Sequence, residues 1–344
     1  MELTFKPYRI ECSHPFGLSR STHDFYDIIY IYLEREGNIG RGEAAPSNHY
    51  GESFESCLRV LETIPSSMVD FEHFQDFKSH VEPLTSGIKS LNAALSMAFF
   101  DLKGKQDKKS IYDKYGYSGN VTCPTSFTIA LGDLQNISEK IDEAESYSIL
   151  KIKLGSDSDR DIINEIRKLT DKTIRVDANE GWTLEQAKDM CSWLASKNVE
   201  LIEQPLKADQ LHLMKELKNE SPLPLIADEN CIDLSDIPKL VDSFHGINIK
   251  LMKCGWCDEV PKMIRLAKKF ELKVMLGCMV ESSVGITAMG QFASEADYLD
   301  LDGNLLIKND PYLGIQINGG VPLLPIGSGL GLSLNMRGES AGLK

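Results

Sequence analysis

The hydrophobic pattern changes near residue 122, and beyond that point the chain repeats one simple alternation. Short apolar runs are separated by longer amphipathic stretches, of which 159–169 and 184–195 are examples. This alternation is typical of βαβ units that build a parallel sheet. The apolar runs predict eight strands, at residues 125–130, 148–153, 173–177, 200–203, 224–228, 247–250, 273–277 and 297–301.

Eight strands in one such series predict a closed barrel rather than an open doubly wound sheet. The eighth strand is followed by the turn-rich segment 303–318, so no helix is expected after it. The predicted fold class is therefore α/β, with a modified (β/α)7β barrel of the TIM type over residues 123–319. The tail, 320–344, is rich in Gly, Pro and Leu, and we expect it to pack back on the N-terminal residues.

Residues 1–122 show a mixed pattern instead. The run 27–34 is rich in β-branched and aromatic residues and predicts a strand. The glycine-containing segment 37–42 predicts a turn. Apolar residues then recur at helical spacing in 52–63 and 87–104. Strands followed by helices indicate a separate α+β module ahead of the barrel.

Composition and charge exclude several classes of protein. Of the 344 residues, 42% are hydrophobic and 26% charged, as in ordinary globular proteins, and the formal net charge is −14. Because that charge repels phosphate groups and no basic stripe is present, neither nucleic acid nor a membrane surface is an expected partner. The eight scattered cysteines indicate reduced thiols, and the first residues lack a secretory pattern. We therefore expect a cytoplasmic protein.

Charged residues stand at the carboxyl ends of the predicted strands. Lys153, Asp177, Glu203, Asp228 and Lys250 follow one another at intervals of 22 to 26 residues, about one βα unit each. In a barrel they share the rim where barrel enzymes keep their active sites. Three carboxylates at one rim repel one another unless a cation lies among them, and an all-oxygen ligand set suits Mg²⁺. The alternative is that each acid pairs with a neighbouring cation or caps the next helix.

The lysines form the second part of the pattern. A strand's period of two puts Lys151 and Lys153 on one face, toward the barrel interior. Lys250 comes four strands later, which is the opposite wall of an eight-stranded barrel. Two bases that face each other can act on the two faces of one carbon atom. The alternative, that the lysines only balance the carboxylates, is less favourable because a lysine inside a barrel is costly to bury.

The series Lys-x-Lys, Asp-Ala-Asn, Glu-Gln-Pro, Ala-Asp-Glu and Asn-Ile-Lys resembles the enolase superfamily, in its muconate-lactonising-enzyme subgroup. The resemblance covers nearly the whole chain, and the combined spacing makes it specific. It implies that residues 1–122 form a capping domain on the barrel. It also implies roles for the residues at the strand ends: Asp177, Glu203 and Asp228 as Mg²⁺ ligands, and Lys153 and Lys250 as the acid/base pair.

One motif narrows the activity within the subgroup. Asp300-Leu-Asp302 resembles the Asp-x-Asp of dipeptide epimerases, which receives the substrate's α-ammonium group, and two carboxylates suit that cation. The alternative for this pair is a surface turn before Gly303. The segment Gly277-Cys-Met279-Val-Glu281-Ser also resembles the subgroup. The resemblance implies further contacts: Lys151, Met279, Glu281 and Arg20 with the substrate, Arg20 with its distal carboxylate, and Asn179 and Glu229 behind the metal ligands.

The sequence thus predicts a Mg²⁺-dependent isomerase that epimerises dipeptides. One lysine removes the α-proton of the C-terminal residue, and the other returns a proton to the opposite face of the resulting enediolate. Two alternatives stay open: another enolase-superfamily enzyme, such as an o-succinylbenzoate synthase or a cycloisomerase, and a non-catalytic barrel that binds a carboxylate ligand. An Ala-Glu substrate and a hydrophobic dipeptide are both compatible with the sequence. Barrels of this size often associate into homo-oligomers, and the sequence leaves the oligomeric state open.

Overall fold

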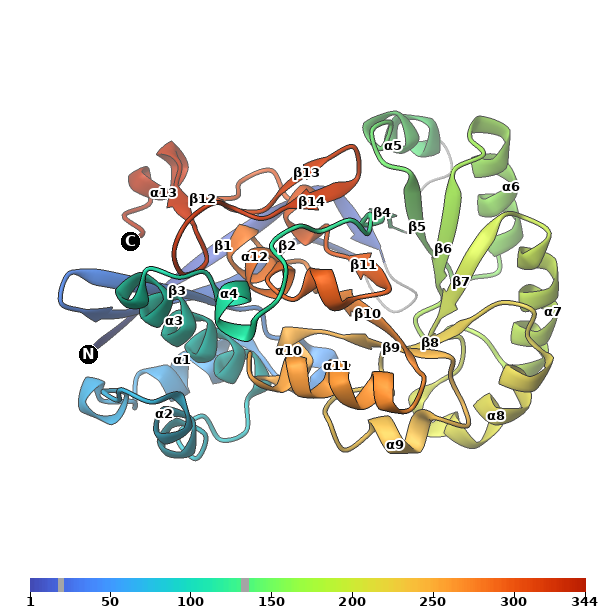
Figure 1. Cartoon of the computed structure of the whole chain (residues 1–344). Coiled ribbons are helices and arrows are strands. Elements are labelled where there is room, and N and C mark those ends of the chain that lie inside the picture. The colour runs from blue at the N-terminus through green and yellow to red at the C-terminus, as the bar shows by residue number, and fades with distance from the viewer. Residues whose placement is uncertain (18–21, 131–135) are drawn as a thin grey trace.

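The computed structural model describes residues 1–17, 22–130 and 136–344. Arg20, the expected contact of a distal carboxylate, lies outside the described residues. The two large sheets of the described chain are a three-stranded antiparallel sheet and an eight-stranded parallel one, which lie side by side (Figure 1). Within these ranges, none of the helices combines the length and the apolar character that crossing a membrane requires.

The parallel sheet is a barrel in which each strand pairs with the next one along the chain. It closes where Thr125, just before β4, forms a parallel bridge with Leu299 of β11, and where the Ser126 N–H donates to the Leu299 carbonyl oxygen (3.1 Å). The predicted (β/α)7β barrel is confirmed. Its described strands are β4 (Phe127–Ile129), β5 (Ile149–Lys153), β6 (Thr173–Asp177), β7 (Val199–Glu203), β8 (Leu225–Ala227), β9 (Gly246–Ile249), β10 (Lys273–Gly277) and β11 (Tyr298–Asp300).

Helices follow the strands and cover the barrel from outside (Figure 1). The helix α6, for example, buries Ile162, Ile163 and Ile166, the spacing of one apolar helical face. After β11 the chain makes only the short 3-10 turn η6 (Gly303–Leu305), in agreement with the turn-rich sequence. The helices of this part are α5 (Ile137–Glu143), α6 (Asp159–Leu169), α7 (Leu184–Ala195), α8 (Leu211–Glu220), α9 (Ile237–Leu240), α10 (Leu251–Cys254), α11 (Glu259–Lys269) and α12 (Ser283–Gly290).

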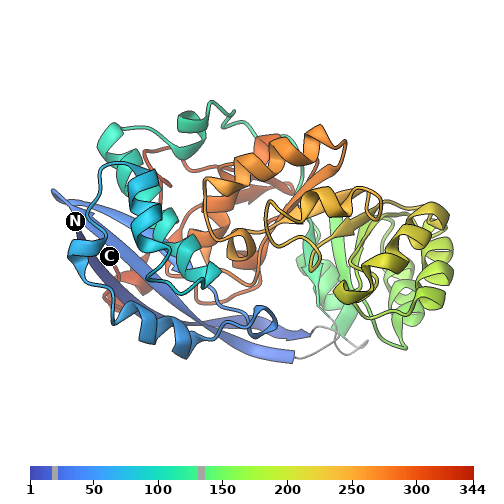
Figure 2. The same ribbon diagram turned by 90° about the horizontal axis from the view of Figure 1, so that it is seen from below.

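The antiparallel sheet opens the chain and is followed by helices, as expected. Its strands are β1 (Glu2–Gly17), β2 (Thr22–Arg35) and β3 (Asn38–Ala44), and the helices after them are α1 (Phe54–Leu61), α2 (Phe74–Val81), α3 (Lys89–Asp107) and α4 (Ile111–Tyr115). Figure 2 shows this module beside the barrel, with both chain ends on its side of the molecule.

The glycines after β2 have a different role from the predicted one. Only Glu36 and Gly37 make the turn, with φ of 53° and 74°, as a two-residue hairpin turn of type I′ requires. The prediction of a turn over 37–42 was therefore wrong beyond Gly37, where β3 begins. Gly40 and Gly42 belong to that strand and let α3 approach closely, because a Cβ on either would lie 1.9 Å from a carbonyl oxygen of the helix.

The C-terminal segment contacts the N-terminal module. The carbonyl oxygen of Lys344 accepts a hydrogen bond from Arg41 Nε (2.7 Å), and Asp101 Oδ1 of α3 accepts one from the Leu330 N–H (2.7 Å). The division of the chain at residues 122 and 319 is our proposal. The elements of the segment are β12 (Tyr312–Leu313), β13 (Gln316–Asn318), β14 (Val321–Leu323), β15 (Ser333–Leu334) and α13 (Met336–Ser340).

A buried cation supports the closed barrel from inside. Arg175 of β6 donates from Nη1 to the Leu299 carbonyl oxygen on β11 (2.7 Å) and pairs with Glu200 (2.7 Å), although β6 and β11 are not neighbours. Arg175→Met should remove the charged one of the two donors to that carbonyl oxygen, leaving the Ser126 N–H, and lower the free energy of unfolding by about 1–3 kcal/mol. Thermal unfolding measures the loss. Arg160→Met, which removes an exposed ion pair to Asp189, is the control and should change little. Equal midpoints for both variants would contradict this role.

Candidate active site

The carboxyl ends of the barrel strands and the N-terminal module together enclose a cavity of about 410 Å³. The barrel rim contributes mostly polar groups, whereas the module contributes aromatic rings and imidazoles together with carboxylates and small polar residues. Lining residues from the rim include Lys151, Lys153, Asn179, Asp228, Glu229, Lys250, Met279, Asp300 and Asp302. Lining residues from the module include Phe16, His23, Tyr26, His49 and Tyr50.

Three buried carboxylates converge at this rim. Asp177 and Glu203 end β6 and β7, and Asp228 directly follows β8. One oxygen from each lies within 4.8 Å of the other two. Burial and the charge of Asp177 raise the pKa of Glu203 above its ordinary value. These three buried groups therefore repel one another beside the cavity, an arrangement that a cation among them would stabilise.

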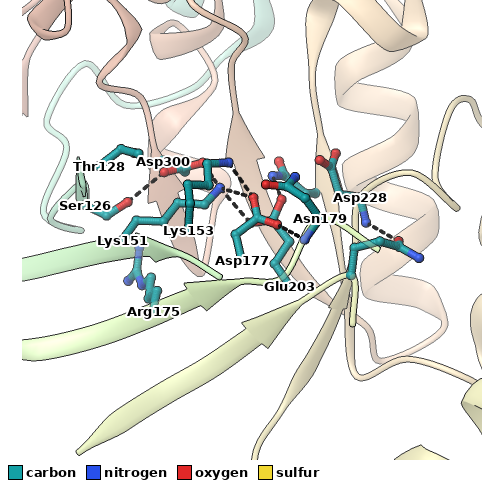
Figure 3. Close-up of polar contacts among 12 residues, drawn as sticks. Ser126, Thr128, Lys151, Lys153, Arg175, Asp177, Asn179, Glu203, Asp228 and Asp300 are labelled. Atoms are coloured by element: carbon teal, nitrogen blue, oxygen red, sulfur yellow. Dashed lines mark hydrogen bonds and ion pairs between the residues drawn. The ribbon is translucent and has the colours of Figure 1, made fainter. Parts of the chain in front are cut away.

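Three lysines form ion pairs with the carboxylates, and Figure 3 shows two of them, Lys151 and Lys153. The Lys151 ammonium lies 2.6 Å from Asp300 Oδ2 and 3.0 Å from Asp177 Oδ2, and the Lys153 ammonium lies 2.7 Å from the same Asp177 oxygen. Lys250 donates to Asp228 Oδ2 (2.7 Å). Lys153 and Lys250 thus meet different members of the cluster, from β5 and from the end of β9. Both lysines line the cavity.

The ion pairs set the charge of these groups. Burial alone lowers the pKa of Lys151, but Asp177, Asp300 and Glu203 outweigh it and hold the pKa well above its ordinary value. Burial likewise raises the pKa of Asp177, and the ammonium groups of Lys151 and Lys153 outweigh that effect and lower it. Each of these buried ammonium groups therefore lies against a carboxylate, as buried charges need to.

Asp300 and Asp302 are both buried, so the alternative of a surface turn is wrong. They differ in their partners, however. Asp300 accepts hydrogen bonds from Ser126 Oγ (2.7 Å) and Lys151 Nζ (2.6 Å), which occupies both of its oxygens. Asp302 accepts at Oδ2 from the Thr128 N–H (2.6 Å). Burial and the charge of Asp300 raise the pKa of Asp302 to about 7.

The remaining expected residues are only partly brought to the cavity. Met279, Asn179 and Glu229 line it, and the Asn179 N–H donates to Asp177 Oδ1 (3.0 Å). Glu281 is buried and accepts from the Met279 N–H (2.7 Å), and it is not among the described residues that line the cavity. Burial and the charge of Glu43 raise the pKa of Glu281 to about 8. The structure therefore places Glu281 behind the loop that carries Met279.

Two buried residues support the carboxylates and were not predicted. Asn248 of β9 donates from Nδ2 to Glu203 Oε1 (2.8 Å), and Lys253 of α10 donates to Asp228 Oδ1 (2.6 Å). Gly277 of β10 makes room for the Asn248 amide, because a Cβ there would lie 2.5 Å from its Oδ1. The period of two from Lys250 could have pointed to Asn248, since both face the barrel interior. For Lys253 the signal was a lysine within an apolar run.

A closed parallel barrel with paired acids and lysines at its C-terminal rim defines the class of (β/α)-barrel enzymes. The model of the enolase C-terminal domain-like family matches residues 136–338. An L-Ala-D/L-amino acid epimerase of Maribacter sp. is 39% identical to this chain. The match covers 97% of this chain and 100% of the relative. The chain therefore belongs to the enolase C-terminal domain-like family, among its dipeptide epimerases.

Solved structures agree with this placement. The L-Ala-D/L-Glu epimerase from Bacillus subtilis, in a substrate-liganded complex, superposes with a TM-score of 0.90 at 25% identity, covering 96% of this chain and 98% of that one. A dipeptide epimerase from Enterococcus faecalis V583, complexed with Mg and the dipeptide L-Leu-L-Tyr, gives 0.89 at 27% identity with the same coverage. Both likenesses include the N-terminal module as well as the barrel.

Proposed function

We propose that this protein is a Mg²⁺-dependent dipeptide epimerase that inverts the α-carbon of the C-terminal residue. The observation that carries the proposal is the placement of Lys153 and Lys250 at separate members of one buried carboxylate cluster, inside a cavity. The substrates named for the relatives from Maribacter and Enterococcus faecalis support the substrate class.

The carboxylate cluster fits Mg²⁺. Asp177, Glu203 and Asp228 offer only oxygen atoms, within 4.8 Å of one another, and the cluster contains neither His nor Cys among the described residues. Oxygen ligands are those that Mg²⁺ prefers. The pKa of Glu203 is raised first by burial and then by the negative charge of Asp177, and a bound cation would relieve the second of these effects. When bound, Mg²⁺ would neutralise the substrate carboxylate and stabilise the negative charge that develops as the α-proton leaves.

The chain's own residues would then move the protons. A substrate held by its carboxylate at the acidic cluster would present its α-carbon to Lys153, which lies at Asp177, and to Lys250, which lies at Asp228. One lysine removes the α-proton as a general base, and the other donates a proton to the opposite face. Their roles exchange when the other epimer binds.

Within Asp300-Leu-Asp302 we assign the substrate's ammonium group to Asp302. Asp300 already holds Ser126 and Lys151 and keeps Lys151 beside Asp177. Asp302 accepts from the N–H (2.6 Å) and the side chain of Thr128, and among the residues that the structure describes it forms no ion pair with a lysine. Asp302 is therefore available to the substrate's ammonium group, whereas Asp300 is already paired with the Lys151 ammonium. We also propose a cytoplasmic location and leave open whether the protein forms homo-oligomers.

Deuterium incorporation from heavy water into a pooled dipeptide library tests the function directly. Mass spectrometry with and without Mg²⁺ should show a one-unit gain that requires the metal, confined to the preferred dipeptides. No gain in any dipeptide, in protein that binds Mg²⁺, would favour an o-succinylbenzoate synthase or a cycloisomerase, whose substrates carry no ammonium group. A barrel that only binds carboxylates would show binding without exchange.

The pH dependence of catalysis tests the ammonium site. The pKa of Asp302 is raised to about 7, so its charged form, which attracts the ammonium group, is lost as the pH falls through that value. The kcat/KM of a free dipeptide should fall about tenfold per pH unit below pH 7. Asp302→Asn should lower kcat/KM and remove this decrease of kcat/KM below pH 7, the acidic limb of the pH profile. An N-acetylated dipeptide, which lacks the cation, is the control, and an identical limb with it would contradict the assignment.

A further inference from the structure

Lys253 is buried completely, yet its ammonium group has a full set of acceptors. It donates to Asp228 Oδ1 (2.6 Å), to the Asp228 carbonyl oxygen (2.7 Å) and to the Asn248 carbonyl oxygen (3.0 Å). An ammonium has three protons, so all three are used. Such a group is expensive to bury and is kept only where its partners need it.

Two lysines therefore hold Asp228 from different sides. Lys250 meets Oδ2 and lines the cavity, whereas Lys253 meets Oδ1 and is absent from the described residues that line it. Lys250 is the extended residue just before the short helix α10 and Lys253 lies inside that helix, so their side chains reach Asp228 from different directions. Lys250 can reach a substrate, and Lys253 is placed to act only through Asp228.

The acceptors of Lys253 also join two strand ends. The Asp228 carbonyl follows β8, and the Asn248 carbonyl lies in β9. Asn248 in turn donates from its side chain to Glu203 Oε1 (2.8 Å). The Lys253 ammonium therefore fixes both the main chain and the side chain of Asp228. It also fixes the main chain of Asn248, whose side chain orients Glu203.

We propose that Lys253 is a positioning residue that orients Asp228 for Mg²⁺. This inference rests on the proposed metal role of Asp228. Groups that orient metal ligands from behind typically contribute 10- to 100-fold to metal affinity. Lys253 does so by fixing which oxygen of Asp228 faces the cavity.

Two possible roles of Lys253, as a positive charge and as a group that orients Asp228, predict opposite changes in Mg²⁺ affinity, so the proposal can be tested. If Lys253 acted only as a positive charge, its removal would leave a more negative site, and Mg²⁺ would bind more tightly. If Lys253 orients Asp228, its removal leaves the carboxylate held by Lys250 alone and takes one donor from each of two buried carbonyl oxygens, of which that of Asp228 keeps the Cys231 N–H. Mg²⁺ would then bind more weakly.

The test is isothermal titration of Mg²⁺ into the metal-free full chain, without substrate, for wild type, Lys253→Met and Lys253→Gln. We expect about 10- to 100-fold weaker binding for Lys253→Met. Lys253→Gln keeps hydrogen-bond donors without the charge and should fall between Met and wild type. Should the Met variant not fold, the Gln variant alone decides. Unchanged or tighter binding in the folded variants would overturn the proposal.

A matched control separates positioning from stability. Lys105 of α3 donates to Asp101 Oδ2 (2.6 Å) and to the Ile39 carbonyl oxygen (2.6 Å), far along the chain from the carboxylate cluster. Lys105→Met should lower the thermal midpoint while leaving Mg²⁺ affinity unchanged. A similar loss of affinity in this control would mean that general destabilisation explains the result and would overturn the positioning role. Wild-type protein that binds no Mg²⁺ would overturn the proposed function as well.

Discussion

Epimerisation should fall about 10²- to 10⁴-fold when either Lys153 or Lys250 is replaced by alanine, the range that a single acid/base group supplies. The two ammonium groups lie at different carboxylates of the cluster, 2.7 Å from Asp177 and from Asp228, so neither can take over the other's face of the α-carbon. Lys188→Ala, which removes a surface ion pair to Glu216, is the control and should retain full activity. Polarimetry or chiral chromatography measures the rate.

Exchange of the α-proton gives a more specific result than the rate. In heavy water each alanine variant should still incorporate deuterium into one epimer, because the remaining lysine removes the proton from its own side. The two variants should therefore prefer opposite epimers. If both variants epimerised normally, or both exchanged the same epimer, the assignment of one lysine to each face would be wrong.

The barrel could be predicted almost residue by residue because its strands are short apolar runs buried on both sides. The run 148–153 became β5 (Ile149–Lys153), all five residues of which are buried. The first strand, β1 (Glu2–Gly17), was not predicted, and its burial explains why. Most of its side chains are exposed or only half-buried, and it lies at the edge of its sheet, so hydrophobic periodicity is weak there.

The candidate site followed from one geometric rule, that parallel strands bring their carboxyl ends together. The rule places Asp177, Glu203 and Asp228 but says nothing of what lies behind them. Lys253 reaches Asp228 from the short helix α10. The difference between Asp300 and Asp302 depends on their hydrogen-bond partners, which lie just before β4, on β4 and on β5. These contacts arise from the closure of the barrel, which the sequence pattern does not describe.

Binding of Mg²⁺ should be lost in Asp228→Asn, together with activity. In the wild type, burial raises the pKa of Asp228, and the charges of Lys250 and Lys253 outweigh that effect and hold it well below its ordinary value. The carboxylate is therefore charged at every working pH, and asparagine replaces a charged oxygen ligand by a neutral amide. We expect Mg²⁺ affinity to fall by at least about 100-fold. Titration calorimetry measures it, with the exposed Asp242→Asn as control.

Thermal unfolding gives an independent reading of the same loss. A ligand that binds only the folded chain stabilises it, so Mg²⁺ should raise the midpoint of the wild type and of Asp242→Asn. Asp228→Asn should show no such rise, and its midpoint without metal should also be lower, because two buried ammonium groups lose their common carboxylate. A full Mg²⁺-dependent rise in Asp228→Asn would remove Asp228 from the ligand set. A preserved rise with activity lost would instead give Asp228 a role in holding Lys250.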